Sequence, residues 1–122
     1  MTDADKPWDL KERTRKFAVR VFRLVQALPR TDPGRIVGNQ LLRAGTSVGA
    51  NYGAAVRPRS EADFISKMTL VEEEIDECMY WMELLVETGL VKEDRLAALL
   101  AEADELAAIV VASIRTAKRK RG

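Results

Sequence analysis

The sequence has no histidine and only one cysteine, Cys78, among its 122 residues. Without histidine, a serine or cysteine nucleophile lacks its usual base, and the histidine ligands of di-iron helical bundles are missing. The single thiol cannot form a disulfide within the chain, and no basic-then-apolar leader opens the sequence. We therefore expect a cytoplasmic protein that is not an enzyme and that holds no cofactor and no metal.

Long apolar runs are also absent. A membrane helix needs about 20 consecutive apolar residues. Residues 36–56 contain only one charge, Arg43, but they include four glycines and several polar side chains, and the apolar segment 106–114 is too short. We expect no membrane span, and a chain of this length fits a single domain over residues 1–122.

Four segments show the periodicity of amphipathic helices, at about residues 8–28, 33–55, 60–87 and 92–117, and a basic tail follows at 118–122. The third is the clearest, because its apolar residues alternate spacings of four and three: Phe64, Met68, Val71, Ile75, Cys78, Met82 and Leu85. No segment alternates with a period of two. Short connections between long helices favour antiparallel neighbours, so the sequence predicts an all-α, up-down-up-down four-helix bundle.

The expected helix boundaries follow from local chemistry. Pro29 ends the first helix because proline disfavours helix in the residue before it. Asp32 is the expected N-cap of the second helix, with Pro33 at its first position. Ser60 is the expected N-cap of the third, and Gly89 the expected C-terminal cap.

The second segment contains glycines at 45, 49 and 53, spaced by four along one helix face. Each interior glycine destabilises a helix by about 1 kcal/mol relative to alanine. Either a partner helix approaches closely along this face, or the helix is kinked or frayed.

Two polar groups are candidates for a site. Arg43, Ser47 and Asn51 are spaced by four on the second helix, where Glu77 of an antiparallel third helix could reach one of them. This set either fixes the register of packed helices through its own hydrogen bonds or lines a recessed ligand site. The second group is acidic, at residues 72–74, 76 and 77, and it spreads around the helix as a solvated or arginine-paired face rather than as a metal site.

Charge is unevenly distributed although the net charge is only +1. Residues 1–59 carry a net +7, residues 60–114 a net −11 and residues 115–122 a net +5. A basic half can simply neutralise an acidic half, or one end can gather the cations. The up-down-up-down topology brings the second loop and the C-terminus to one end, which predicts a basic end that contacts nucleic acid: Arg57, Arg59, Lys118, Arg119, Lys120 and Arg121.

Several of these residues resemble the motif of a bacterial four-helix bundle family, the 23S rRNA intervening-sequence proteins, with a more distant similarity to the accessory protein of diversity-generating retroelements. The similar positions are residues 40–52, Ser60, Asp63, Phe64, Glu74, Glu77, Tyr80 and Trp81. The chain departs from the pattern at Ala54, where many members have glutamate, and it matches only in part at Gly89-Leu90.

The resemblance implies a homo-oligomer, a pentameric ring, and associates the retroelement relative with nucleic acid and a reverse transcriptase. Two hypotheses about function follow. In the first, the basic ends of an oligomer contact RNA or DNA backbone without reading its sequence. In the second, the protein is a structural adaptor that recruits another protein, such as a reverse transcriptase, and has no nucleic-acid role.

Overall fold

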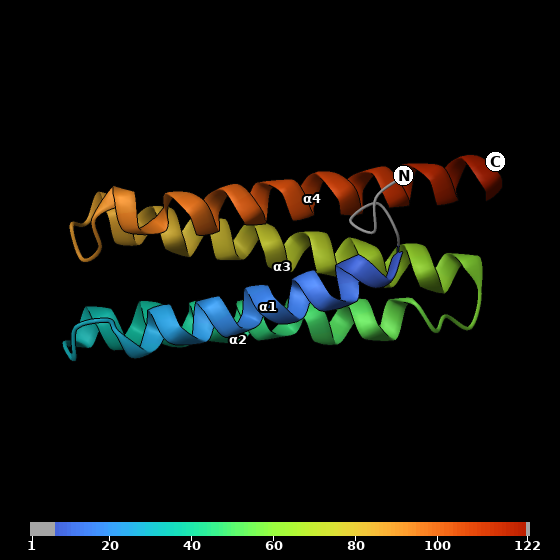
Figure 1. The fold of residues 1–122 in the computed structure, drawn as a ribbon. Coiled ribbons are helices and arrows are strands. Elements are labelled where there is room, and N and C mark those ends of the chain that lie inside the picture. The colour runs from blue at the N-terminus through green and yellow to red at the C-terminus, as the bar shows by residue number, and fades with distance from the viewer. Residues whose placement is uncertain (1–6, 122) are drawn as a thin grey trace.

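The computed structural model describes residues 7–121, with side chains from Leu10 onward. Four helices run through this part of the chain: α1 (Pro7–Gln26), α2 (Asp32–Ala55), α3 (Glu61–Glu87) and α4 (Glu93–Arg121). Successive helices run in opposite directions, and none of residues 7–121 forms a strand (Figure 1). The predicted all-α, up-down-up-down bundle is confirmed.

Neighbouring helices in the sequence are also neighbours in space. α2 packs extensively on both α1 and α3, and α3 packs on α4, whereas α1 and α4 share far fewer contacts. The bundle is therefore closed least along the seam between α1 and α4.

The apolar stripes of the four helices meet in one core. Six of the seven seam residues expected on α3 are buried, and Phe64 at its N-terminal end is only partly covered. Every residue expected on the stripe of α4 is buried: Leu96, Leu99, Ala103, Leu106, Val110 and Ile114.

Three expected helix boundaries were wrong. α4 runs to Arg121 rather than to about residue 117, so the expected basic tail is helical as far as Arg121. α1 ends at Gln26 rather than at residue 28, because Ala27 and Leu28 already form turn hydrogen bonds before Pro29. The N-cap of α2 is Thr31 rather than Asp32: its hydroxyl accepts the backbone N–H of Gly34 at 3.2 Å. Asp32 is the first helical residue and pairs with Arg35 instead.

The N-cap of α3 is Ser60, as expected, and its hydroxyl accepts the N–H of Asp63 at 3.0 Å. The carboxylate of Asp63 reaches back to the backbone N–H of Arg59, also at 3.0 Å. Gly89, beyond the end of α3, has φ +77°, a conformation that glycine adopts without strain.

The glycines of α2 lie in one uninterrupted helix, so the alternative of a frayed helix is wrong. At Gly45 the expected close approach is confirmed, because a Cβ atom would lie 2.7 Å from Cγ1 of Val21 on α1. At Gly53 it is wrong for the contacts within this chain: a Cβ atom there would meet nothing within 4 Å. α1 therefore packs closely against the glycine face of α2 at Gly45 but not at Gly53.

Candidate nucleic-acid interface

The topology brings the expected basic residues to one end of the bundle. The loop between α2 and α3 carries Arg57 and Arg59, and the last turn of α4, which ends beside this loop, carries residues 118–121 (Figure 1). The two basic segments lie at the same end of the bundle because α2 and α4 run in the same direction, so that their C-termini share this end.

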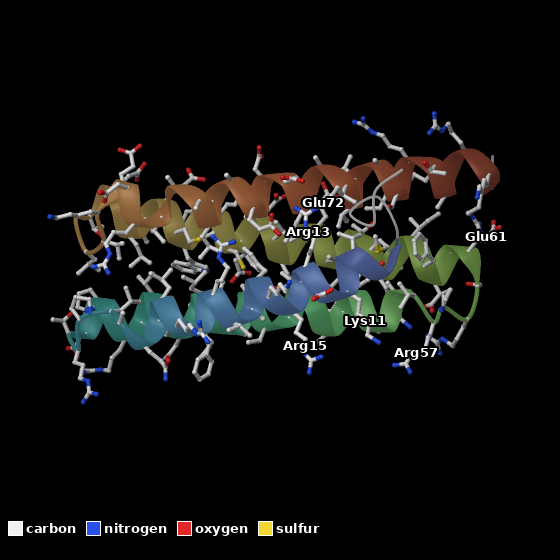
Figure 2. All side chains as sticks on the ribbon, viewed as in Figure 1. Lys11, Arg13, Arg15, Arg57, Glu61 and Glu72 are labelled. Atoms are coloured by element: carbon white, nitrogen blue, oxygen red, sulfur yellow. The ribbon has the colours of Figure 1, made fainter. Side chains whose placement is uncertain are left out.

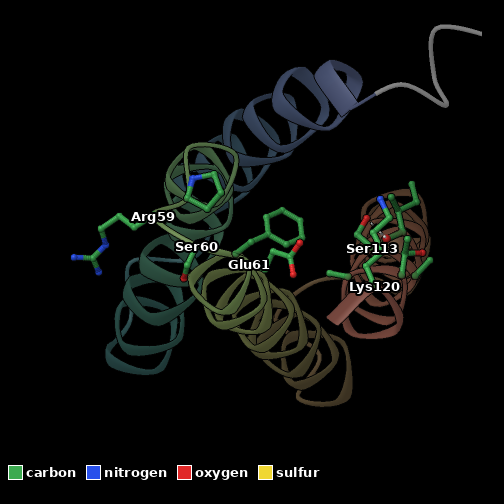
Figure 3. Close-up of a pocket in the computed structure, with 11 residues that line it drawn as sticks. Arg59, Ser60, Glu61, Ser113 and Lys120 are labelled. Carbon is green, nitrogen blue, oxygen red and sulfur yellow. Dashed lines mark hydrogen bonds between the residues drawn. The ribbon is translucent and has the colours of Figure 1, made fainter. Parts of the chain in front are cut away.

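A groove of about 690 Å³ separates this loop from the end of α4. Arg59 and Glu61 lie on one side, and Ser113 and Lys120 on the other (Figure 3). Its lining also includes apolar side chains: Phe64, Ile109, Ala112 and Ala117. The groove therefore has an apolar floor and mixed charges at its edges.

Most cations at this end are free of acidic partners among the described residues. Arg59 is 3.6 Å from Asp63, and Arg119 donates a hydrogen bond to the hydroxyl of Thr116. Arg57, Lys118, Lys120 and Arg121 are exposed and form no ion pair within the described part of the chain. The pKa of Asp63 is lowered, first by the N–H of Arg59 and then by the ammonium of Lys67.

A second basic surface was not expected from the sequence. α1 carries six lysine or arginine residues, and Lys11 and Arg15 extend from it to the same side of the bundle as Arg57 (Figure 2). These residues are spaced by four on the outer face of α1. That spacing was visible in the sequence, but the side of the bundle that Lys11 and Arg15 share with Arg57 was not (Figure 2).

Arg13 of α1 has a different role. Its guanidinium donates two hydrogen bonds to the carboxylate of Glu102 on α4, at 3.2 and 2.7 Å, and lies 3.1 Å from Glu105. Glu102 is the largest of the influences that raise the pKa of Arg13. Because α1 and α4 share few contacts, this pair ties the two helices together across the loosest seam of the bundle.

The polar set that was expected around Asn51 lies on the outer surface between α2 and α3, not in the core. Arg43 contacts both Glu77 and Glu74, and the indole N–H of Trp81 donates to Glu77 at 3.0 Å. The pKa of Glu77 is lowered, chiefly by the Trp81 hydrogen bond and also by Arg43.

Ser47 and Asn51 do not join this ion pair. The Ser47 hydroxyl donates to the carbonyl of Arg43, and the Asn51 amide donates to the carbonyl of Ser47, both along α2 itself. The structure thus brings Arg43 and Glu77 together, while Ser47 and Asn51 bond to the helix backbone.

Cys78 is fully buried, and burial, reinforced by nearby Glu74 and Glu77, raises its pKa to about 12. Among residues with described side chains, no three acidic or thiol groups converge as a metal site would require.

No helix in the described part of the chain is both long enough and apolar enough to cross a membrane.

The geometry is that of an antiparallel four-helix bundle with strongly segregated surface charge. The family model described as "23S rRNA-intervening sequence protein" matches residues 7–112, and the chain belongs to this family. A search of curated proteins gave no match.

A solved structure from Bacteroides thetaiotaomicron VPI-5482 is similar, with a TM-score of 0.84 and 30% sequence identity. The alignment covers 89% of this chain and 97% of that one. That protein is described as a member of the S23 ribosomal protein family with unknown function.

Proposed function

We propose that this protein is a non-enzymatic, cytoplasmic homo-oligomer, a pentamer, that binds the backbone of RNA or DNA through its basic end. The observation that carries the proposal is that loop residues Arg57 and Arg59 lie at the same end of the bundle as the basic last turn of α4. Most of these cations have no acidic partner among the described residues. Free cations at one end can neutralise phosphates and release their counterions.

Assembly strengthens this binding because each copy adds its own set of cations. A single end offers few phosphate contacts, and backbone contacts alone carry no sequence information. Several ends held in one oligomer act together on a single strand, which raises the avidity without adding a new kind of contact. The expected binding is therefore independent of sequence and strongly dependent on salt.

The apolar floor of the groove at the same end favours a second candidate function. Phe64 and Ile109 would accept an apolar side chain of a protein segment, and Glu61 and Lys120 would flank it (Figure 3). In this alternative the protein is an adaptor that recruits another protein, such as a reverse transcriptase, and binds no nucleic acid.

Salt-dependent retention of RNA and DNA discriminates between the two candidates. The test variant replaces four cations of the basic end by alanine: Arg57→Ala, Arg59→Ala, Lys118→Ala and Lys120→Ala. The matched control removes the same charge from the opposite end: Arg30→Ala, Arg35→Ala, Lys92→Ala and Arg95→Ala. Affinity is measured by fluorescence anisotropy with labelled single- and double-stranded oligonucleotides. The salt concentration is raised from about 50 to about 200 mM, a range over which phosphate contacts weaken strongly.

We expect the test variant to lose affinity and to reduce the slope of log K against log salt by about one for each phosphate contact removed. The control variant should keep more of the affinity and more of the salt dependence. Equal losses in the two variants would mean that only net charge matters. Absence of binding by the unmodified protein would favour the adaptor.

A further inference from the structure

A groove on the outer side of α1 and α2 plays no part in the proposed nucleic-acid site. It encloses about 910 Å³, and we call it the α1–α2 groove. Its floor consists mainly of small residues from both helices: Ala18, Thr46, Gly49, Ala50 and Gly53. Its edges carry cations from α1: Lys11, Arg15, Lys16, Arg20 and Arg23.

Most cations of this groove form no ion pair among the described residues. Among the described residues, only Arg13 and Lys16 of α1 form ion pairs, with α4 and with Glu12 respectively. Lys11, Arg15 and Arg23 are exposed and have no such partner there. The groove therefore presents positive charge that the described part of the bundle does not neutralise.

The floor also contains a residue that packing within the chain does not explain. Gly53 lies in the interior of α2, where it destabilises the helix by about 1 kcal/mol relative to alanine. A Cβ atom at this position would meet nothing within 4 Å. Together with the exposed Ala50 next to it, Gly53 leaves the floor low enough for a bulky side chain from outside.

A surface of complementary shape and charge lies on α3 of the same chain. Five exposed residues follow one another at spacings of three and four, which places them along one face: Glu73, Asp76, Tyr80, Glu83 and Glu87. We call this set the α3 stripe. Its aromatic member, Tyr80, is 58% exposed and rests edge-on against Trp81.

The acidic residues of the stripe likewise form no ion pair among the described residues. The ion pairs that α3 forms among the described residues involve Asp63, Glu74 and Glu77, none of which belongs to the stripe. Asp76 and Glu83 lie about one turn to either side of Tyr80. An aromatic anchor flanked by carboxylates matches a small-residue floor flanked by cations.

We propose that the α1–α2 groove is the docking site for the α3 stripe of a second copy of this chain. The inference rests on the homo-oligomer part of the proposed function and identifies the surfaces that join its copies. Tyr80 enters over Ala50 and Gly53, and the flanking carboxylates meet cations such as Lys11 and Arg15. The two surfaces differ, so each copy offers one of each, and such head-to-tail contacts close into a ring when the rotation between copies permits.

A second copy fits the groove better than a nucleic acid does. A phosphate backbone needs cations but has no use for a floor of alanine and glycine, whereas an aromatic side chain buried on such a floor is the usual anchor of a protein interface. The chain also supplies the complementary charge itself: α3 carries nine acidic residues against one lysine. Complementary charge of this kind steers association and selects the partner.

Charge reversal on each surface, measured by sedimentation velocity across a concentration series, tests the proposal. The groove variant is Lys11→Glu with Arg15→Glu, and the stripe variant is Asp76→Lys with Glu83→Lys. A third protein combines all four changes. The control, Arg30→Glu with Lys92→Glu, makes the same charge change as the groove variant in exposed loops at the far end.

We expect the groove and stripe variants each to raise the dissociation constant of the oligomer at least tenfold. The combined variant should regain most of the assembly, because its charges are again opposite, and the control should assemble normally. Assembly that is unchanged in either variant, or not regained in the combination, overturns the proposal. So does a protein that stays monomeric throughout.

Shape is tested separately from charge by Ala50→Gln. Residue 50 is exposed in the single chain, so a longer neutral side chain should leave helix content and thermal stability of the dissociated protein unchanged. In the docked state it would occupy the space of Tyr80, and we expect weaker assembly. Normal assembly of this variant contradicts the docking geometry.

Nucleic-acid binding by the same variants separates this proposal from the previous one. If the groove variant assembles normally but loses oligonucleotide affinity, the occupant of the groove is nucleic acid and the docking proposal is wrong. If the variants with altered surfaces fail to assemble while the basic-end variant alone loses intrinsic salt-dependent binding, both proposals stand. If the surface variants assemble normally and the basic-end variant still loses salt-dependent binding, the docking proposal is wrong and the nucleic-acid proposal stands.

Discussion

Two glycines on one face of α2 should respond in opposite ways to the same substitution. Gly45→Ala and Gly53→Ala both add a Cβ atom to a helix interior, and both gain about 1 kcal/mol of helix propensity. At Gly53 the new atom meets nothing within 4 Å, so the gain should appear as higher stability. At Gly45 it would lie 2.7 Å from Cγ1 and 3.0 Å from Cβ of Val21, which is buried and branched and cannot move aside.

The difference between the two variants isolates this clash because the propensity term cancels. Overpacking of a well-packed core costs about 1–3 kcal/mol. We therefore expect Gly53→Ala to exceed Gly45→Ala by about 1–3 kcal/mol in free energy of unfolding, with Gly45→Ala at or below the unmodified protein. For a chain of this size each kcal/mol moves Tm by roughly 3–6 °C.

The assay is urea unfolding followed by circular dichroism, with the linear extrapolation used to obtain the free energy of unfolding. Protein concentrations must lie below the range of self-association, because assembly adds its own stabilisation. A midpoint that does not change with protein concentration establishes this. Equal stability of the two variants, or a more stable Gly45→Ala, would refute the close approach of α1 and α2 at residue 45.

Three further measurements test other details of the structure. Thr31→Ala should lower the free energy of unfolding by about 1 kcal/mol through loss of the N-cap of α2, and Asp32→Ala by less, as measured by urea unfolding. Glu77 has a lowered pKa in the folded state, so its contribution is present above the unfolded value of about 4.3 and is lost as pH falls through the folded pKa; Glu77→Gln should flatten the acid limb of a stability–pH profile. Cys78, with its pKa raised to about 12, should react with an aromatic disulfide reagent at pH 8 only as fast as the protein unfolds, and fast labelling in native conditions would contradict its burial.

The sequence predicted the bundle well because the helices are long and their apolar periods are regular. Six of seven seam residues of α3 and the whole α4 stripe are buried, since a stripe of three-and-four spacing has only one face to bury. The cap of α2 was predicted one residue too late. Threonine and aspartate are both good caps, and adjacent candidates compete through geometry that the sequence does not contain.

The candidate site was predicted only in part. Topology alone placed the second loop beside the end of α4, so the basic end followed from the order of the helices. The direction of side chains around each helix was harder to infer. Arg43 does reach Glu77, but Ser47 and Asn51 share its spacing and still bond to their own backbone, since short polar side chains in a helix readily donate to the carbonyl four residues before.

The segregation of charge connects the two proposals. Had the basic and acidic halves simply neutralised each other inside one bundle, cross-helix ion pairs would be numerous; among the described residues such pairs are confined to Arg13 with α4 and Arg43 with α3. The remaining acids of α3 and cations of α1 face outward, where exposed charges contribute little to the stability of a single chain. Placed in contact between copies, these charges would be partly shielded from water, and the attraction between them would become stronger. Assembly through these surfaces covers the acidic stripe together with the cations of the α1–α2 groove and leaves the cations at the end of α4 exposed, so these cations would remain available to a polyanion although the net charge is only +1.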